Sequence, residues 1–369
     1  MKKYCYILLS LLFITGCYRS ERPVSNGAFQ SHVDVQAHAF DFDQIQSTGE
    51  IIVATLSGPA TYYEYQGRRK GLQYAFIQHF AQNHGLRVRV ELAHHEDGLI
   101  AQLQSGNADV ICYPLSEQVI AAHGLVSAGV RDTLSHTSWA VRSDAPLLRA
   151  ALNRWAEKGF VVTIRKTEQE ETRRQRQVKK KSQAPYLSRE KGLISHYDSY
   201  FKTAACVVGW DWRLLAAQCY QESGFDPEAV SWAGARGLMQ IMPPAAAHLR
   251  VRQEQLFIPR ENIAAAATYL HELDRKLADI SNSSERIKFV LAAYNGGLGH
   301  VRDAMALAQK YGSNANQWQS VSPYLLKLSE EKYYRDEVVK YGYMIGSETY
   351  QYVNAILARW YNYCTIIHP

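Results

Sequence analysis

The chain lacks the signatures of several protein classes. Its cysteines and histidines form no cluster with the spacing of a zinc site, and it contains no aromatic-basic motif of the RNA-binding kind. The formal net charge of +6 over 369 residues is mild. This charge does not indicate a dedicated nucleic-acid-binding protein, although it suits a polyanionic neighbour such as a bacterial envelope. With 47% hydrophobic and 21% charged residues, the composition excludes a disordered chain or a protein with many membrane spans.

Long hydrophobic runs are also scarce, and the clearest one is at the N-terminus, "MKKYCYILLSLLFITGCYRSERP". The apolar run from Tyr6 to Ile14 is too short to span a bilayer and predicts a secretory signal over residues 1–17. Its end, residues 13–17, resembles a bacterial lipobox, in which the cysteine is acylated. We therefore expect Cys17 to anchor a lipoprotein that faces the periplasm, in the outer membrane. The alternative is an ordinary signal peptide with an incidental cysteine.

Cysteine itself is rare, with six in the chain. One lies within the signal and one is the lipobox residue, which leaves Cys112, Cys206, Cys219 and Cys364. Export permits disulfides, and Cys206 and Cys219 flank a short connection between two expected helices, so they could pair. Four buried free thiols are the alternative.

The length allows two domains of ordinary size. After a polar tether (18–47), residues 48–162 alternate between strand and helix patterns, which predicts a small α/β lobe with a mainly parallel sheet. The strands are expected at 49–58, 86–92 and 108–115, and the helices at 71–85 and 97–106. This order resembles the first lobe of periplasmic solute-binding proteins of the amino-acid-binding type. The segment 135–159 resembles their final return segment, so the resemblance covers one lobe only, and a structural or docking role is expected rather than ligand capture.

Residues 163–192 carry a dense charge run with few apolar residues, as in a solvated linker or an exposed helix. From there to residue 369, alanine- and leucine-rich stretches broken by glycine and proline predict a mostly α-helical domain (193–369). The overall fold class is therefore α+β.

Within the helical domain, one carboxylate stands out in "CYQESGFDPEAVSWAGARGLMQIMP", residues 219–243. Asp211 is a suitable N-cap for a helix that Gly224 would end, and Glu222 follows Leu215 and Cys219 on one face. A carboxyl group against apolar neighbours has its neutral form favoured, as a general acid requires. The alternative is a glutamate that points into water at a frayed helix end, and helix position alone does not decide between them.

This string, with "AAYNGGLGHV" (292–301) and "YGYMIGSETYQYVNAI" (341–356), resembles the catalytic domain of soluble-lytic-type lytic transglycosylases, relatives of goose-type lysozyme. With the α/β lobe in front, the chain resembles the membrane-bound lytic transglycosylase F group. The resemblance implies a lysozyme-like domain that cleaves the MurNAc–GlcNAc bond of peptidoglycan and forms a 1,6-anhydro ring, without a metal or cofactor. It implies that Glu222 is the single catalytic acid and base, and that the substrate-binding residues are Ser231, Met239, Gln240, Tyr294, Asn295 and Tyr352.

Two other functions stay open from the sequence. The same scaffold could be a muramidase that hydrolyses the bond with water, or a non-catalytic lipoprotein that senses peptidoglycan or a solute. In either case the partner is the glycan strand, with membrane attachment through lipid and no role for nucleic acid.

Overall fold

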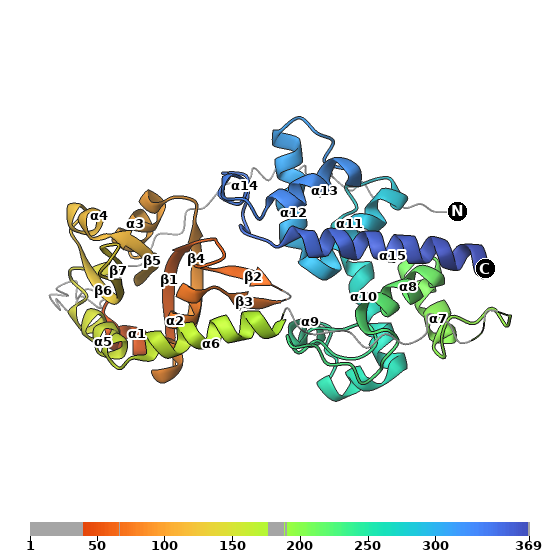
Figure 1. Ribbon diagram of the computed structural model, residues 1–369, viewed down its shortest axis with the longest axis horizontal. Coiled ribbons are helices and arrows are strands. Elements are labelled where there is room, and N and C mark those ends of the chain that lie inside the picture. The colour runs from red at the N-terminus through yellow and green to blue at the C-terminus, as the bar shows by residue number, and fades with distance from the viewer. Residues whose placement is uncertain (1–39, 66, 176–187, 189, 368–369) are drawn as a thin grey trace, which may run out of the picture. The chain divides into compact units, whose positions relative to one another are not determined.

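The computed structural model describes residues 40–65, 67–175, 188 and 190–367 (Figure 1). The expected signal, the lipobox Cys17 and most of the tether lie outside these residues, as does the middle of the charged linker. None of the helices in the described part of the chain combines the length and apolar character needed to cross a bilayer. The α+β fold class predicted from the sequence is confirmed.

The N-terminal part is an α/β lobe built on a five-stranded sheet with the order β4-β1-β5-β7-β6. Its strands are β1 (Glu50–Leu56), β4 (Arg87–Ala93), β5 (Val110–Ser116), β6 (Leu125–Asp132) and β7 (Thr137–Arg142), and a separate hairpin consists of β2 (Tyr63–Tyr65) and β3 (Arg68–Lys70). The strand β1 pairs in parallel with both neighbours, and Val53 lies opposite Val90 on one side and Val110 on the other. The strands β7 and β6 are antiparallel, so the sheet is mixed.

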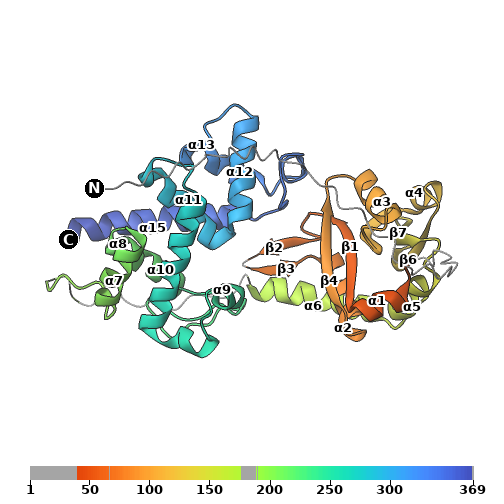
Figure 2. The ribbon, with the colours of Figure 1, turned by 180° about the vertical axis from the view of Figure 1, so that it is seen from behind.

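Helices cover both faces of this sheet (Figures 1 and 2). They are α1 (Phe42–Thr48), α2 (Leu72–Asn83), α3 (Glu96–Gln104), α4 (Glu117–Ala122), α5 (Pro146–Glu157) and α6 (Phe160–Gln175). Successive residues of β1 point to opposite faces. Accordingly Val53 packs in one hydrophobic core with α2 and α5, and Leu56 packs in a second core with α3.

The lobe contains more elements than the three strands and two helices expected from the sequence, and α1, β6 and α6 are examples. Residues 42–48, placed at the end of the polar tether, form α1 because Asp41 caps the helix and Ile45 is fully buried. The strand β6 was not predicted, since a bulge between Ala128 and Arg131, with Gly129 at a φ of 65°, interrupts its alternation. The charged linker, expected from residue 163, begins inside α6. The first residues of α6 pack against the hydrophobic core and contact α2 and α5.

The C-terminal part is a helical domain with a single large core. Its helices are α7 (Asp198–Val208), α8 (Trp212–Ser223), α9 (Pro243–His248), the 3₁₀ helix η1 (Gln253–Phe257), α10 (Pro259–Lys276), α11 (Ser283–Gly296), α12 (Leu298–Lys310), α13 (Trp318–Lys327), α14 (Glu331–Tyr334) and α15 (Gly346–Ile366). Residues 190–367 contain isolated β-bridges but no named strand, as expected. The last helix, α15, packs along α8, α11 and α13 (Figure 1).

Candidate active site

The helix α8 carries Glu222 in its last turn. Asp211 caps its N-terminus by accepting a hydrogen bond from the Arg213 N–H at 2.8 Å, and Gly224 ends it in the left-handed conformation with a φ of 66°, as predicted. The helix is buried from Trp212 to Cys219, whereas Glu222 is half-buried. Burial of the preceding turns fixes the position of a carboxyl group that emerges at the end of the helix.

Tyr352, on α15, contacts this carboxyl group directly. Its hydroxyl donates a hydrogen bond to Oε1 of Glu222 at 2.5 Å, although the two residues are 130 positions apart in the sequence. Tyr352 is only 5% exposed. Burial, and then the negative charge of Glu222, raise the pKa of Tyr352 well above its ordinary value. The phenol therefore stays neutral and remains a hydrogen-bond donor to Glu222.

Tyr294, near the end of α11, also lies within the electrostatic influence of Glu222. Its pKa is raised well above the ordinary value, first by burial and then by the charge of Glu222. Its hydroxyl donates to the backbone carbonyl of Met239 at 2.7 Å. Tyr294 thus ties α11 to the loop that follows α8.

That loop, residues 225–242 between α8 and α9, contains three of the predicted substrate-binding residues. The Ser231 hydroxyl accepts from the Ala235 N–H at 3.0 Å. The Gln240 side-chain amide donates to the carbonyls of Ala229 and Gly237 at 3.1 and 2.9 Å. Met239 is 1% exposed and belongs to the core. In this structure, therefore, all three help to shape the 225–242 loop.

The loop is also held by a residue that the sequence analysis did not select. Asn262 on α10 is fully buried, accepts a hydrogen bond from the Met239 N–H at 2.7 Å, and donates to the carbonyls of Arg236 and Leu256. Gly237 permits this close packing. Its φ is +73°, and a Cβ there would lie 2.0 Å from the Leu256 carbonyl oxygen.

Asn295 receives a hydrogen bond from the Thr349 hydroxyl at 2.8 Å, which joins α11 to α15. The absence of a side chain at Gly296 allows this approach, because a Cβ there would lie 2.7 Å from the Thr349 hydroxyl oxygen. Asn295 therefore helps to fix α15, the helix that carries Tyr352.

Sequence analysis also missed Gln218, one turn before Glu222 on α8. It is fully buried, and its Nε2 donates to the Tyr352 hydroxyl oxygen at 3.2 Å. A polar amide among the apolar residues of a buried helix was the available signal. Its partner could not be inferred, because Tyr352 is 134 residues away.

The cysteines show neither of the two predicted arrangements. All four described cysteines are free, with Cys206 exposed, Cys219 and Cys112 buried, and Cys364 partly buried. The possible Cys206–Cys219 disulfide is therefore absent, since one thiol is exposed and the other is buried. Burial raises the pKa of Cys219, so it is a neutral thiol next to the site.

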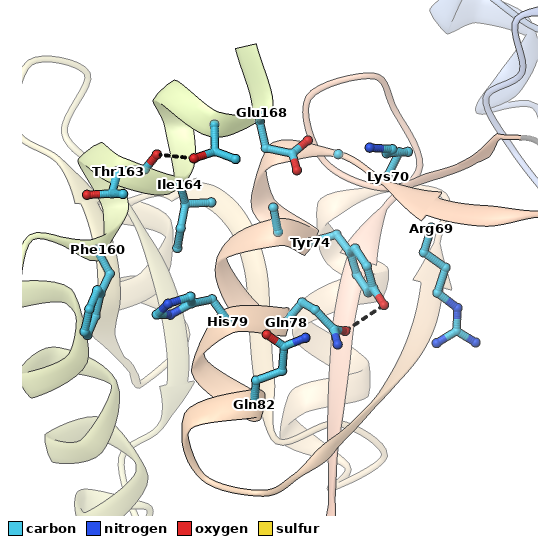
Figure 3. Close-up of a pocket in the computed structure, with 13 residues that line it drawn as sticks. Arg69, Lys70, Tyr74, Gln78, His79, Gln82, Phe160, Thr163, Ile164 and Glu168 are labelled. Atoms are coloured by element: carbon cyan, nitrogen blue, oxygen red, sulfur yellow. Dashed lines mark hydrogen bonds between the residues drawn. The ribbon is translucent and has the colours of Figure 1, made fainter. Parts of the chain in front are cut away.

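The described residues contain no group of three or more His, Cys, Asp or Glu side chains arranged to hold a metal ion. The α/β lobe contains a cavity of about 440 Å³ between α2, β3 and α6 (Figure 3). Side chains of α2 and α6 face one another there, and the Tyr74 hydroxyl donates to Gln78 at 2.8 Å. All residues that line this cavity belong to the lobe, so it is separate from the site around Glu222.

Comparisons with known proteins give matches to the helical domain. The model of the transglycosylase SLT domain family matches residues 199–317. The membrane-bound lytic murein transglycosylase F of Aeromonas hydrophila subsp. hydrophila is 40% identical over 171 residues, which cover 46% of this chain and 33% of that protein. The protein of the same name from Haemophilus influenzae (strain PittEE) is 44% identical over 171 residues, covering 46% and 34%. The chain thus spans about a third of the length of the curated relatives it matches.

Two solved structures are similar to portions of the chain. The 70 kDa soluble lytic transglycosylase SLT70 from Escherichia coli is 26% identical, with a TM-score of 0.32, over 46% of this chain and 24% of that chain. Domain 1 of TmArgBP, in its arginine-bound form, is 18% identical, with a TM-score of 0.29, over 32% of this chain and 98% of that chain. The resemblance that the sequence motifs indicated is confirmed to this extent: the transglycosylase SLT domain model matches residues 199–317, within the helical domain.

Proposed function

We propose that this chain is a lytic transglycosylase that cleaves the β-1,4 bond between MurNAc and GlcNAc in peptidoglycan and leaves a 1,6-anhydro-MurNAc end. The observation that carries the proposal is the contact between the Tyr352 hydroxyl and Oε1 of Glu222 at 2.5 Å. A neutral hydrogen-bond donor on Oε1 stabilises the carboxylate that forms when this half-buried group gives up its proton. The SLT domain match over residues 199–317 supports this assignment.

In the first step, Glu222 acts as a general acid. Its proton moves to the glycosidic oxygen, and the bond between that oxygen and the anomeric carbon breaks. Glu222 becomes a carboxylate, and the hydrogen bond from Tyr352 stabilises this new charge. The acetamido carbonyl oxygen of MurNAc bonds to the anomeric carbon and takes the positive charge.

In the second step, the same carboxylate acts as a base. It removes the proton from the C6 hydroxyl of the same sugar, and O6 attacks the anomeric carbon. The bond to the acetamido oxygen breaks, the anhydro ring closes, and Glu222 is again protonated. No water is consumed, and no metal or cofactor takes part.

This scheme explains why one carboxylate is sufficient. Retaining glycosidases usually need a second carboxylate as nucleophile, whereas substrate-assisted enzymes use a group of the substrate. Asp226 lies nearby in the sequence, but its carboxylate accepts a hydrogen bond from the Glu228 N–H at 3.0 Å and stabilises a turn. We therefore give it no part in the chemistry.

We assign supporting roles to the remaining predicted residues. Ser231, Met239 and Gln240 shape the 225–242 loop, which we propose as one wall of the glycan site. Tyr294 holds that loop, and Asn295 holds α15 through Thr349. The loop carbonyls and the Ser231 hydroxyl would then meet the sugar, while the side-chain amide of Gln240 keeps the loop rigid.

We also propose that Cys17 carries the lipid anchor and that the enzyme acts on glycan strands from the membrane, in the cell envelope. The lipobox-like residues 13–17 support this. The charge of +6 suits the anionic envelope and gives no reason to expect nucleic acid as a partner. Labelling cells with a clickable fatty acid tests the anchor, because Cys17→Ser should remove both the label and membrane association.

Digestion of purified sacculi with the full chain tests the activity. The products should carry anhydro ends, which mass spectrometry shows as lighter than reducing ends by one water. Glu222→Gln keeps the shape of the side chain but cannot donate an acid proton, and it should release nothing. Reducing ends would identify a hydrolase, and a Glu222→Gln variant as active as the parent would indicate that the helical domain does not use this carboxyl group.

A further inference from the structure

Three tyrosine rings gather on the surface of the helical domain, where the end of α12 meets α13 and α14. Tyr311 directly follows α12, Tyr324 lies in α13 and Tyr333 lies in α14. The Tyr311 ring stacks on the Tyr324 ring with centroids 5.7 Å apart and an interplanar angle of 16°, and it lies 5.8 Å from the Tyr333 ring. Apolar residues scattered singly over a surface need no explanation, whereas a contiguous group of this kind is typical of an interaction site.

The rings are held in place by the core behind them. Tyr324 and Tyr333 are half-buried and pack against the core of the helical domain, whereas Tyr311 is 43% exposed. Leu325, the neighbour of Tyr324, is buried, and a Cβ at Gly346 would overlap with its carbonyl group. The backbone of α13 therefore lies directly against the first turn of α15. Rings held in this way lose little conformational entropy when they bind a partner.

Two lysines lie over these rings. The Lys327 ammonium is 4.9 Å from the centroid of Tyr324 and 5.0 Å from that of Tyr333, and the Lys332 ammonium is 5.6 Å from that of Tyr333. Such cation–π contacts are weak at an exposed site. Within the part of the chain that the structure describes, neither lysine forms an ion pair, and Glu330, between them in the sequence, pairs with neither.

The other acidic side chains nearby in the sequence are paired with different cations. Glu331 pairs with Arg335 at 2.8 Å. Lys310 pairs with Asp336 at 2.8 Å and with Glu337 at 3.1 Å. An aromatic ring accepts no conventional hydrogen bond from an ammonium group, which has three donors. The two lysines over the rings therefore have donors available for an anion from outside the chain.

This combination of groups matches the chemistry of a peptidoglycan strand. The C–H groups on one face of a pyranose ring carry partial positive charge and are attracted to the negative face of an aromatic ring. The exposed side of Tyr311 offers such a face. The peptide stems attached to MurNAc carry carboxylates, which form charge-assisted hydrogen bonds with ammonium groups.

We propose that these side chains form an accessory glycan-binding surface, in addition to the site around Glu222. It holds a peptidoglycan strand through the face of a sugar and through the carboxylates of the peptide stems. The tyrosine–lysine surface consists of Tyr311, Tyr333, Lys327 and Lys332, and Tyr324 only supports Tyr311 from behind with its ring. This inference rests on the proposed function, because the ligand is the substrate named there.

A lipid surface fits these residues less well. Membrane surfaces are bound by protruding aliphatic and aromatic side chains that enter the acyl region. Within α13, Leu326 is the one exposed aliphatic residue, and its exposed fraction is 36%. The tyrosines lie against one another and against the core instead of protruding.

The experiment measures binding of the full chain to purified sacculi by cosedimentation, in a Glu222→Gln background that should leave the sacculi intact. Tyr311→Ala should weaken binding about tenfold, and Tyr311→Phe, which keeps the ring, by about twofold or less. Lys327→Gln and Lys332→Gln should each weaken binding about threefold, and this effect should fade as salt is added. The Tm of each variant should stay within about 3 °C of the background, since these are surface substitutions.

Glycan strands without stem peptides separate the two kinds of contact. Tyr311→Ala should weaken binding to these strands as it does on sacculi, because the ring contacts the sugar. The two lysine variants should bind them as tightly as the background does, because the carboxylates are missing. The lysine variants also keep the test decisive if Tyr311→Ala lowers the Tm.

Two control variants in the helical domain change similar groups elsewhere. Tyr361→Ala removes a tyrosine that is 60% exposed and stacks on Trp360. Lys202→Gln removes an ammonium group 4.9 Å from the centroid of the Trp212 ring. Both should bind sacculi as tightly as the background.

Tyr311→Ala and lysine variants that bind sacculi like the background would overturn the inference, and so would control variants with equal losses. Variants that lose binding to phosphatidylglycerol vesicles but keep binding to sacculi would assign the surface to lipid and overturn it as well. A parent chain that releases no anhydro products refutes the proposed function, and the accessory surface then stands or falls by the binding data alone. An active parent with unaffected binding in the variants refutes the surface alone.

Discussion

The Tyr352 hydroxyl, on α15, donates to Oε1 of Glu222, on α8, across 2.5 Å. This bond connects the last helix of the chain to the end of the helix that carries the proposed acid. Because burial and the charge of Glu222 raise the pKa of Tyr352, the phenol remains protonated over the working range of an enzyme. The relationship between these two residues leads to the first prediction.

Tyr352→Phe should reduce kcat on sacculi by about 10- to 100-fold, which corresponds to the loss of one hydrogen bond to a charged group, about 1.5–3 kcal/mol. The phenylalanine ring keeps the packing of α15 on α8, so folding should be retained. The rate of clearing of a sacculus suspension measures the effect. Tyr324→Phe, on a ring that stacks on Tyr311, is the control and should keep the parent rate.

The second prediction concerns the geometry of the 225–242 loop. Gly237→Ala should lower the free energy of unfolding by about 3 kcal/mol or more, because a left-handed backbone disfavours a Cβ and that Cβ would lie 2.0 Å from the Leu256 carbonyl oxygen. Gly312→Ala changes a residue with nearly the same φ, +74°, where nothing lies within 4 Å. It should cost only about 1 kcal/mol. Equal losses in urea unfolding would show that contact with Leu256 is not the cause.

The third prediction concerns two buried titratable residues on α12. Burial raises the pKa of Asp303 from 3.8 to about 6, although its carboxylate accepts hydrogen bonds from the N–H groups of Lys340 and Tyr341. Burial lowers the pKa of His300 from 6.5 to about 4. Asp303 therefore makes its full contribution to the free energy of unfolding below pH 3.8, and this contribution is lost as pH rises through about 6. His300 makes its full contribution to the free energy of unfolding above pH 6.5, and this contribution is lost as pH falls through about 4.

These two contributions to the free energy of unfolding oppose each other between about pH 4 and 6, so each residue masks the effect of the other. Asp303→Asn removes one of them, and its free energy of unfolding should fall more steeply than that of the parent as pH is lowered, by a difference of order 3 kcal/mol over the window. His300→Gln should give the opposite change in slope. Urea unfolding at a series of pH values measures both slopes, and identical slopes for parent and Asp303→Asn would contradict the burial of this carboxyl group.

Sequence patterns predicted α8 well because its determinants are local. Asp211 and Gly224 supply the two caps, and both lie next to the helix in the sequence. The strand β6 was missed because Gly129 and the bulge disturb its alternation, and α1 was missed because a single buried residue, Ile45, identifies it as part of the fold. Short elements such as these depend on packing rather than on local pattern.

The active-site residues show the same difference between local and long-range determinants. Glu222 could be selected from its own helix and motif, but the roles of Gln218 and Asn262 depend on contacts with residues far away in the sequence. A buried amide indicates that a partner exists without identifying it. The substrate-binding roles of Ser231 and Gln240 came from the family motif and stay predictions, and in the structure their side chains bond to the loop backbone.

The central claim is that Glu222 catalyses ring closure by the sugar's own hydroxyl rather than attack by water. Digestion of sacculi in water enriched in heavy oxygen tests this claim directly, with mass spectrometry of the released muropeptides. The account predicts anhydro products that contain none of the heavy oxygen, and no products from Glu222→Gln. Products that carry one heavy oxygen at a reducing end would contradict it.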